Sequence, residues 1–186
     1  MTEELSFDVV RLAREGDSAA MTELYEHYRS RIYGYLFYRV GDTHQAEDLT
    51  AEVFLRVVEK LPGYRFQAIP FQAWLFQIAR NLAIDHYRKT NAHPMVELDA
   101  NLITNHESPE QATEWSVIAR QLKQALDRLT TEQCDVIVLR FLVGMPVQQV
   151  AETLNKSEGS VKALQARGLE ALHRMLSWRV YHDTPR

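Results

Sequence analysis

Apolar residues recur at helical spacing along nearly the whole chain, and this periodicity limits the fold more than any other feature. Leu49, Val53, Val57 and Leu61 return every fourth residue, which places them on one face of a helix, and Pro62 then stops the pattern. The chain has only seven glycines and six prolines among 186 residues, which disfavours a turn-rich β fold. The sequence therefore predicts an all-α fold.

A break divides this helical pattern into two parts. Residues 90–112 lose the periodicity, contain Pro94 and Pro109, and are rich in Asn, Thr, Ser and acidic residues, which is typical of a linker. The pattern predicts two helices within residues 5–40, one over 46–61 and one over about 71–89, with further helices from about 114 to 178. We therefore predict two small helical domains joined by a flexible acidic linker.

The charge of the chain is unevenly distributed. A net charge of −4 excludes a strongly basic nucleic-acid coat protein. By segment, however, the charge is −5 over residues 1–60, +3 over 61–93, −5 over 94–114 and +3 over 115–186. The two positive segments also contain the features that are typical of DNA binding, as described below.

Cysteine content and hydropathy exclude other classes of protein. A single cysteine, Cys134, excludes an internal disulfide framework and a cysteine-based zinc cluster. The longest stretch without charge, residues 66–79, has 14 residues and is too short and too polar to span a membrane. Because the first residues are acidic and lack the basic and apolar regions of a secretory signal, we expect a cytoplasmic protein without membrane insertion.

The second half contains the pattern of a helix-turn-helix. Thr130 and Gln133 form a capping box that opens a helix, for which we predict an apolar face of Val136, Ile137, Leu139 and Phe141. A second helix follows over 147–154, and a third begins near Glu158. Three residues have the types and spacing that the motif requires. Ala151 is small enough for a close helix crossing, Asn155 can adopt the left-handed conformation of the turn, and Val161 can pack between the two helices.

The third helix would then enter the major groove of DNA. Ser157 is the predicted N-cap, which leaves the first turn of the helix free to meet phosphates or base edges. The predicted DNA contacts of this motif are Lys156, Ser157, Ser160, Lys162, Ala163, Gln165, Ala166 and Arg167.

Aromatic and basic residues alternate over residues 64–89, in the first positive segment. Aromatic rings stack on unpaired bases, and Arg and Lys neutralise phosphates, so this composition favours binding of bases extruded from a duplex. Trp74 and the loop over 62–71 are the strongest candidates, because single aromatics such as Phe71 and Phe76 also fit the core of a small helical domain.

Three segments, in this order, resemble the extracytoplasmic-function sigma factors, which are specificity subunits of bacterial RNA polymerase. They are residues 46–57 (AEDLTAEVFLRV), residues 74–89 (WLFQIARNLAIDHYRK) and the helix-turn-helix. The resemblance implies sigma region 2 over residues 1–92, a linker over 93–112 and sigma region 4 over 113–186. This sequence differs from many members of the family at two places. Ala163 and Leu164 stand where Ser and Arg are usual, and Pro146 stands where a Ser or Thr is usual.

The resemblance also implies partners and site residues. The partners are the clamp and flap regions of the polymerase core, promoter DNA and an anti-sigma factor, and the second domain would bind the minus-35 element. The residues implied for opening and reading the minus-10 element are Tyr64, Arg65, Phe66, Phe71, Trp74, Arg80, Asn81, Asp85, Arg88 and Lys89. Those implied for polymerase binding are Asp48, Leu49, Glu52, Phe54 and Arg56.

Two other classes of function are weighed against this one. A helix-turn-helix regulator that acts without polymerase would bind a palindromic duplex site through a dimer. A metal enzyme is disfavoured because the seven histidines show no i,i+4 pair and no carboxylate-rich ligand spacing. We therefore predict no catalytic residue, no metal and no cofactor, and the sequence leaves the promoter unnamed.

Overall fold

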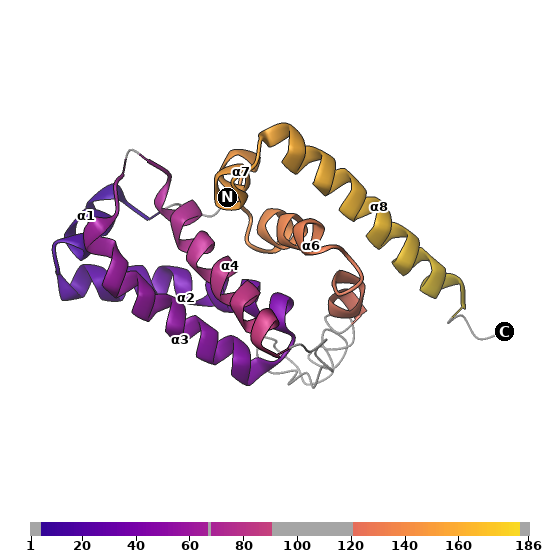
Figure 1. The fold of residues 1–186 in the computed structure, drawn as a ribbon, viewed down its shortest axis with the longest axis horizontal. Coiled ribbons are helices and arrows are strands. Elements are labelled where there is room, and N and C mark those ends of the chain that lie inside the picture. The colour runs from indigo at the N-terminus through magenta and orange to yellow at the C-terminus, as the bar shows by residue number, and fades with distance from the viewer. Residues whose placement is uncertain (1–4, 67, 91–120, 183–186) are drawn as a thin grey trace, which may run out of the picture.

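The computed structural model describes residues 5–66, 68–90 and 121–182, and this part of the chain is helical throughout apart from its turns and loops (Figure 1). The elements are α1 (Phe7–Arg14), α2 (Ser18–Val40), α3 (Thr43–Lys60), the 3₁₀ turn η1 (Leu61–Gly63), α4 (Phe71–Thr90), a helical stretch over 121–126, α6 (Thr131–Ile137), the π-helical η3 (Val138–Leu142), α7 (Val147–Leu154) and α8 (Glu158–His182). The prediction of an all-α fold with two helical domains is confirmed, whereas the predicted linker over 93–112 lies outside the described residues.

Helices α1 to α4 form the first domain, and their starts follow from local hydrogen bonding. The Asp17 carboxylate accepts from the backbone N–H of Ala20 at 2.8 Å, and the Asp42 carboxylate accepts from that of Gln45 at 2.7 Å, so α2 and α3 both have side-chain N-caps. Most positions of the apolar stripes predicted for these helices face inward, but Leu12 and Tyr25, which the same pattern places on these faces, are each 38% exposed. The fully buried positions include Leu24, Tyr28, Ile32, Leu36, Val53, Val57, Leu75 and Ala79.

The second domain consists of α6 to α8 and the stretch before them. The predicted capping box is present: Gln133 N–H donates to Thr130 Oγ1, and Thr130 N–H donates to Gln133 Oε1. The predicted inward position of Phe141 is wrong, because its side chain is 52% exposed. Residues 138–142 wind as a π-helix, shown by the bond from Val143 N–H to the Val138 carbonyl, and this wider turn rotates Phe141 out of the stripe that an α-helix would give.

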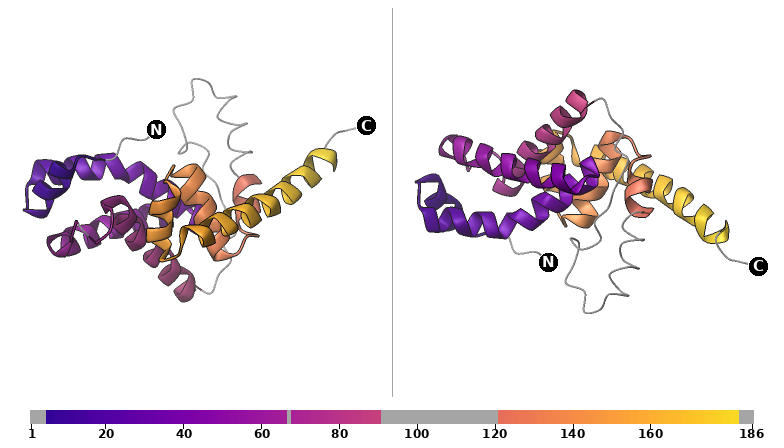
Figure 2. Two further views of the ribbon diagram at one scale, coloured as in Figure 1. Left: turned by 90° about the horizontal axis from the view of Figure 1, so that it is seen from above. Right: turned by 90° about the horizontal axis from the view of Figure 1, so that it is seen from below.

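The two domains pack against each other. In Figures 1 and 2, α4 lies between the other helices of the first domain and the pair α6 and α7, and α8 extends away from the body of the molecule. Helix α4 contacts α7, and α2 contacts η3. No described helix is long and apolar enough to cross a membrane. The packing joins the two domains that carry the predicted DNA-binding helices, α4 and α8.

Candidate nucleic-acid interface

The turn between α7 and α8 has the geometry that a helix-turn-helix requires. Asn155 has φ 52° and ψ 51°, in the left-handed region, and Lys156 N–H donates to the Ala151 carbonyl at 2.9 Å. Asn tolerates this region better than other residues that carry a Cβ. Val161, predicted to pack between the two helices, is buried together with Leu154 and Leu164, and the small Ala151 at the helix crossing is buried as well. The predicted motif is therefore present.

Helix α8 crosses α6 closely at Gly168. A Cβ at this position would lie 3.0 Å from Cγ1 of Ile137, so glycine permits the approach of the two helices. The contact supports α8 from behind and leaves the opposite side of its first turns open.

The first turns of α8 present most of the predicted DNA contacts to solvent. Ser157 caps the helix, since its Oγ accepts from Ser160 N–H at 3.2 Å, which confirms the predicted N-cap. Lys162 lies 4.0 Å from Glu158, a loose exposed pair that leaves the ammonium accessible. The exposed members of the predicted set are Ser157, Ser160, Lys162, Ala163, Ala166 and Arg167.

Two members of the predicted set are instead engaged within their own domain. Lys156 Nζ lies 2.7 Å from a carboxylate oxygen of Glu132 on α6. Gln165 is half-buried, and its Oε1 accepts from Nε of Arg140 at 3.2 Å. Sequence spacing alone places these residues near the groove, but their partners, Glu132 on α6 and Arg140 on η3, lie 24 and 25 residues earlier in the chain.

Helix α4 has two distinct faces that carry predicted minus-10 residues. Trp74, Asn81, Asp85 and Arg88 follow one another at spacings of seven, four and three residues and therefore share a face. Trp74 is half-buried and the other three are exposed, and Arg88 lies 3.8 Å from Asp85. Lys89 is exposed beside them.

Arg80 lies on the other face, together with Ala73 and Gln77, and points into the second domain. Its Nε donates to Oδ2 of Asp135 at 2.8 Å, and its side chain is 22% exposed. Gln77 donates to the Glu152 carbonyl at 2.9 Å. The structure therefore separates Arg80 from the remaining predicted residues of α4.

The Asp135 side chain is fully buried and has two further partners on α2. Tyr35 donates its hydroxyl to Oδ1 at 2.9 Å, and Nε of Arg39 lies 3.1 Å from the same oxygen. Burial alone would lower the pKa of the Arg39 guanidinium, but the charge of Asp135 outweighs it and raises that pKa above its ordinary value. Burial, assisted by the same carboxylate, raises the pKa of Tyr35 well above its ordinary value. Sequence reasoning missed all three residues.

The loop before α4 is an aromatic cluster rather than an array of free rings. Tyr64 is buried and donates to the Ile69 carbonyl at 2.7 Å, and its ring lies 5.0 Å from that of Trp74 and 5.1 Å from that of Phe66. Phe71 is also buried, whereas Phe66 is half-buried and Arg65 is exposed. Phe66, Trp74 and Arg65 are therefore the accessible members of this predicted group.

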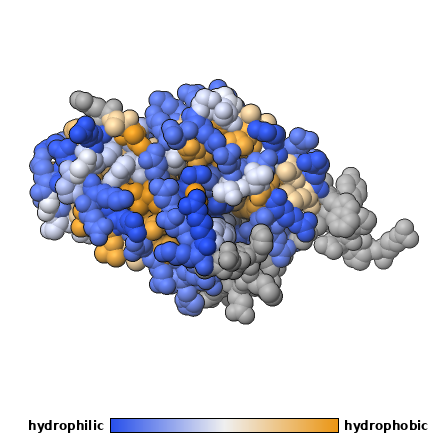
Figure 3. Space-filling view, viewed as in Figure 1, coloured by the Kyte–Doolittle hydropathy of each residue, from blue (hydrophilic) through white to orange (hydrophobic). Residues whose placement is uncertain are grey.

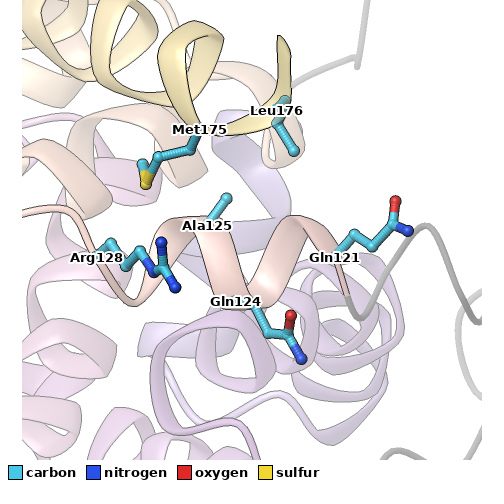
Figure 4. Close-up of a pocket in the computed structure, with 6 residues that line it drawn as sticks. All are labelled: Gln121, Gln124, Ala125, Arg128, Met175 and Leu176. Atoms are coloured by element: carbon cyan, nitrogen blue, oxygen red, sulfur yellow. The ribbon is translucent and has the colours of Figure 1, made fainter. Parts of the chain in front are cut away.

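Two cavities accompany these surfaces. One of about 240 Å³ is lined by the aromatic cluster and by α1, including Phe7, Tyr64, Phe66, Phe71 and Gln72. The other, drawn in Figure 4, lies between residues 121–128 and the end of α8 and measures about 20 Å³, which is room for one water. Among residues 5–66, 68–90 and 121–182, no three His, Cys, Asp or Glu side chains come together in a way that could hold a metal ion.

Helix α3 carries the residues predicted to bind polymerase. Glu52 and Arg56 form the expected i,i+4 pair at 2.9 Å, and Asp48 is exposed. Phe54, in contrast, is buried, with its ring 4.7 Å from that of Tyr25.

The same helix also exposes apolar side chains that the prediction omitted. Leu55 is 60% and Val58 is 55% exposed. Their i,i+3 spacing among charged residues is the sequence feature that could have indicated an exposed apolar pair on this helix. Figure 3 shows the face of the molecule seen in Figure 1 as largely hydrophilic, with separate hydrophobic areas.

Comparisons with known proteins bear on both domains. A family model described as Sigma-70 region 2 matches residues 24–93, and one described as Sigma-70, region 4 matches residues 125–174. The ECF RNA polymerase sigma factor BldN of Streptomyces coelicolor is 38% identical over 91% of this chain, which spans 65% of the BldN length. The ECF RNA polymerase sigma factor SigX of Bacillus subtilis is 34% identical over 81% of this chain and 80% of its own length.

Two solved structures share the fold. CnrH, in complex with the cytosolic domain of CnrY, superposes with a TM-score of 0.73 at 22% identity, covering 91% of this chain and 96% of its own. RpoE of Bartonella quintana, in complex with the anti-sigma factor NepR, gives a TM-score of 0.68 at 18% identity, covering 84% and 96%.

Proposed function

Because this chain belongs to the extracytoplasmic-function sigma factors of the sigma-70 family, we propose that it binds the core of bacterial RNA polymerase and directs transcription initiation at specific promoters. The observation that carries the proposal is the order of the two matched domains, the second of which ends in an exposed basic recognition helix. RNA synthesis itself would be catalysed by the polymerase core, inside the cell.

In this proposal α8 reads the minus-35 element as duplex DNA. The N-terminal residues of a recognition helix contact base edges in the major groove. Lys162 and Arg167 are exposed cations suited to phosphates. Ala163 and Ala166 are exposed and small, so the helix can approach the bases closely, and their methyl groups suit contact with thymine methyl groups.

The exposed face of α4 and the preceding loop would open and read the minus-10 element. Trp74 and Phe66 are half-buried, so each ring is held in place by the aromatic cluster while part of it stays accessible for stacking on an unpaired base. Arg65 is exposed in the same loop as Phe66, and Arg88 and Lys89 are exposed about 21 Å further along α4 than Trp74 at 1.5 Å per residue; all three would neutralise phosphates. The adjacent cavity of about 240 Å³ is lined by aromatic rings and by the buried amide of Gln72, which suits an extruded base.

Helix α3 would dock on the clamp of the polymerase core. Its exposed Leu55 and Val58 lie among Asp48, Glu52 and Arg56, so an apolar centre is surrounded by charges of both signs. Apolar centres with polar rims are usual in protein–protein interfaces. A contact of the second domain with the flap and an anti-sigma partner are further expectations of the family resemblance.

Run-off transcription with purified core polymerase tests the function. We expect the full chain to support specific transcripts from promoter fragments of its own genome, with core alone as the control.

The variant Trp74→Ala tests promoter opening. It should bind core polymerase with the parent affinity, but promoter thymines should no longer react with permanganate, because the stacking ring is absent. Absence of any specific product, together with a footprint on duplex DNA without polymerase, would instead identify an independent helix-turn-helix regulator.

A further inference from the structure

Helix α1 lies outside the segment predicted to read the minus-10 element, but it contacts that segment at one ring. In Figure 1, α1 lies beside the loop that leads into α4. The ring centroid of Phe7 lies 4.5 Å from that of Phe66, and the guanidinium carbon of Arg14 lies 5.0 Å from the centroid of the same ring. Phe7 and Arg14 are spaced as i and i+7, so one face of α1 holds Phe66.

The Phe66 ring is supported by its own loop as well as by α1. The Tyr64 ring lies 5.1 Å from it, edge-on, and Tyr64 is fixed in turn by the hydrogen bond from its hydroxyl to the Ile69 carbonyl at 2.7 Å. Phe66 itself is half-buried, so part of the ring stays open to solvent. Contacts with two separate elements restrict the rotamers that the side chain can adopt. The orientation of Phe66 therefore depends on α1.

Phe7 also forms part of the wall of the cavity that we propose to receive an extruded base. This cavity of about 240 Å³ is lined by Phe7 together with Tyr64, Phe66 and Gln72. Phe7 is 60% exposed, so its ring borders both the cavity and the solvent. The rings of Phe7 and Phe66 therefore lie together where a base that stacks on Phe66 has to enter.

The two arginines of α1 differ in how their charges are used. Arg11 lies 3.2 Å from Glu15 and 3.6 Å from Asp8, so carboxylates neutralise it. In the part of the chain that the structure describes, no carboxylate pairs with Arg14, which lies over the Phe66 ring instead. A guanidinium that lies over an aromatic ring keeps its charge and its N–H donors for a phosphate. Arg14 is therefore the cation of α1 that suits the backbone of a nucleotide stacked on Phe66.

We propose that α1 is part of the minus-10 interface, in which Phe7 and Arg14 hold the Phe66 ring for stacking on an unpaired base and Arg14 binds the adjacent phosphate. Phe7 is a positioning residue, because it acts through Phe66. The inference rests on the proposed function, since it adds residues to the same interface. It extends that interface beyond residues 64–89 to an element some 50 residues earlier in the chain.

Binding of unpaired DNA by the full chain, without polymerase, tests the proposal. The probe is fluorescein-labelled single-stranded DNA of about 12 nucleotides and random sequence, because stacking on aromatic rings tolerates every base. Fluorescence anisotropy gives its affinity at several salt concentrations. Arg14→Ala should lower the affinity about fivefold at roughly 0.1 M salt and lower the slope of log affinity against log salt by about 0.7, the value for one phosphate contact on a single strand.

Two further variants are matched to Arg14→Ala. Arg11→Ala removes a charge from the same helix that Asp8 and Glu15 already neutralise, so its affinity and slope should equal those of the parent. Arg14→Lys keeps the charge and should keep the slope. An equal loss of slope in Arg11→Ala and Arg14→Ala would overturn the proposed phosphate contact.

Phe7→Ala separates positioning from charge. It should lower the affinity about fivefold at the parent slope, and Phe66→Ala should lower it about tenfold. In a Phe66→Ala background, Phe7→Ala should change the affinity by less than about twofold, because the ring through which Phe7 acts is already absent. Since Phe7 is 60% exposed, we expect its replacement to keep the fold, which helical circular dichroism checks for each variant.

Parent-like affinity of Phe7→Ala, or fully additive losses in the double variant, would overturn the positioning role. Failure of the parent chain to bind the probe would overturn the proposal as a whole. Because no polymerase is present, specific run-off transcripts combined with parent-like variants would count against this inference alone. The expected losses without any specific transcript would instead leave the α1 contacts standing and refute promoter-directed transcription.

Discussion

Asn155 shows how one backbone conformation determines the angle between α7 and α8. Its φ of 52° is strained for residues with a Cβ, and Asn reduces that strain through its short polar side chain. Asn155→Gly should therefore leave stability nearly unchanged, whereas Asn155→Ala should lower the free energy of unfolding by about 1 kcal/mol. Thermal unfolding of the full chain, followed by circular dichroism, measures both changes. Equal melting temperatures for the two variants would show that the turn bears no strain.

Tyr87 should make the stability of the folded protein depend on pH in the alkaline range. Burial raises the pKa of its phenol from 10.0 to about 12, and the hydroxyl donates to the Arg39 carbonyl, joining α4 to α2. A proton that is held more tightly in the folded state stabilises that state below pH 10, and the contribution is lost as the pH rises toward 12.

We therefore expect phenolate absorbance to show a group titrating near pH 12 that is absent from Tyr87→Phe. The parent protein should also lose melting temperature between pH 10 and 12 more steeply than this variant does. Identical slopes in the two proteins would contradict the assignment.

At the scale of the element, α8 combines a fixed cap with a basic outer face. If Lys162 and Arg167 contact phosphates, replacing either by Ala should lower the slope of log affinity against log salt by about 1 for holoenzyme on a minus-35 fragment. Arg174 is an exposed cation on the same helix, about 18 Å from Lys162 at 1.5 Å per residue, so Arg174→Ala should keep the parent slope. If all three variants lowered the slope of log affinity against log salt, the overall positive charge of α8 rather than localised phosphate contacts would explain the salt dependence.

The elements were largely predictable from sequence because their signals are local. The Thr130 capping box, the left-handed turn at Asn155 and the N-cap at Ser157 each involve residues within a few positions of one another. Phe141 was placed wrongly because α-helical periodicity assumes a constant turn, and the bond from Val143 to Val138 changes that turn.

At the scale of the whole molecule, the candidate site could be predicted only in part. Tyr35 and Arg80 lie 100 and 55 residues before Asp135, and no periodicity connects positions so far apart. Arg80 was grouped with Trp74 and Arg88 because all three belong to one basic aromatic segment, but the second domain covers only one of the two faces of α4. Segment charge pointed to two candidate DNA-binding regions and gave no indication that their domains pack together.

The packing of α4 against α7 makes a prediction about transcription. Cysteines placed at Ala73 and Thr153, in a Cys134→Ala background, would lie on opposite sides of the interface, because the Thr153 hydroxyl is 3.5 Å from the Ala73 carbonyl. A short bis-maleimide linker with a cleavable disulfide should join them and hold the two domains together. Cross-linked protein should then fail to direct run-off transcription, because the tether keeps the face of α4 that carries Arg80 packed against the second domain.

Cleavage of the linker by reductant should restore the transcript, and the two single-cysteine proteins should be active before and after treatment. This recovery separates the effect of the tether from damage by the substitutions, since the same molecules are measured in both states. Full transcription by the cross-linked protein would mean that promoter binding does not require the α4–α7 contact to break. Loss of activity that reductant reverses would show that separation of the domains is a step on the path to the promoter.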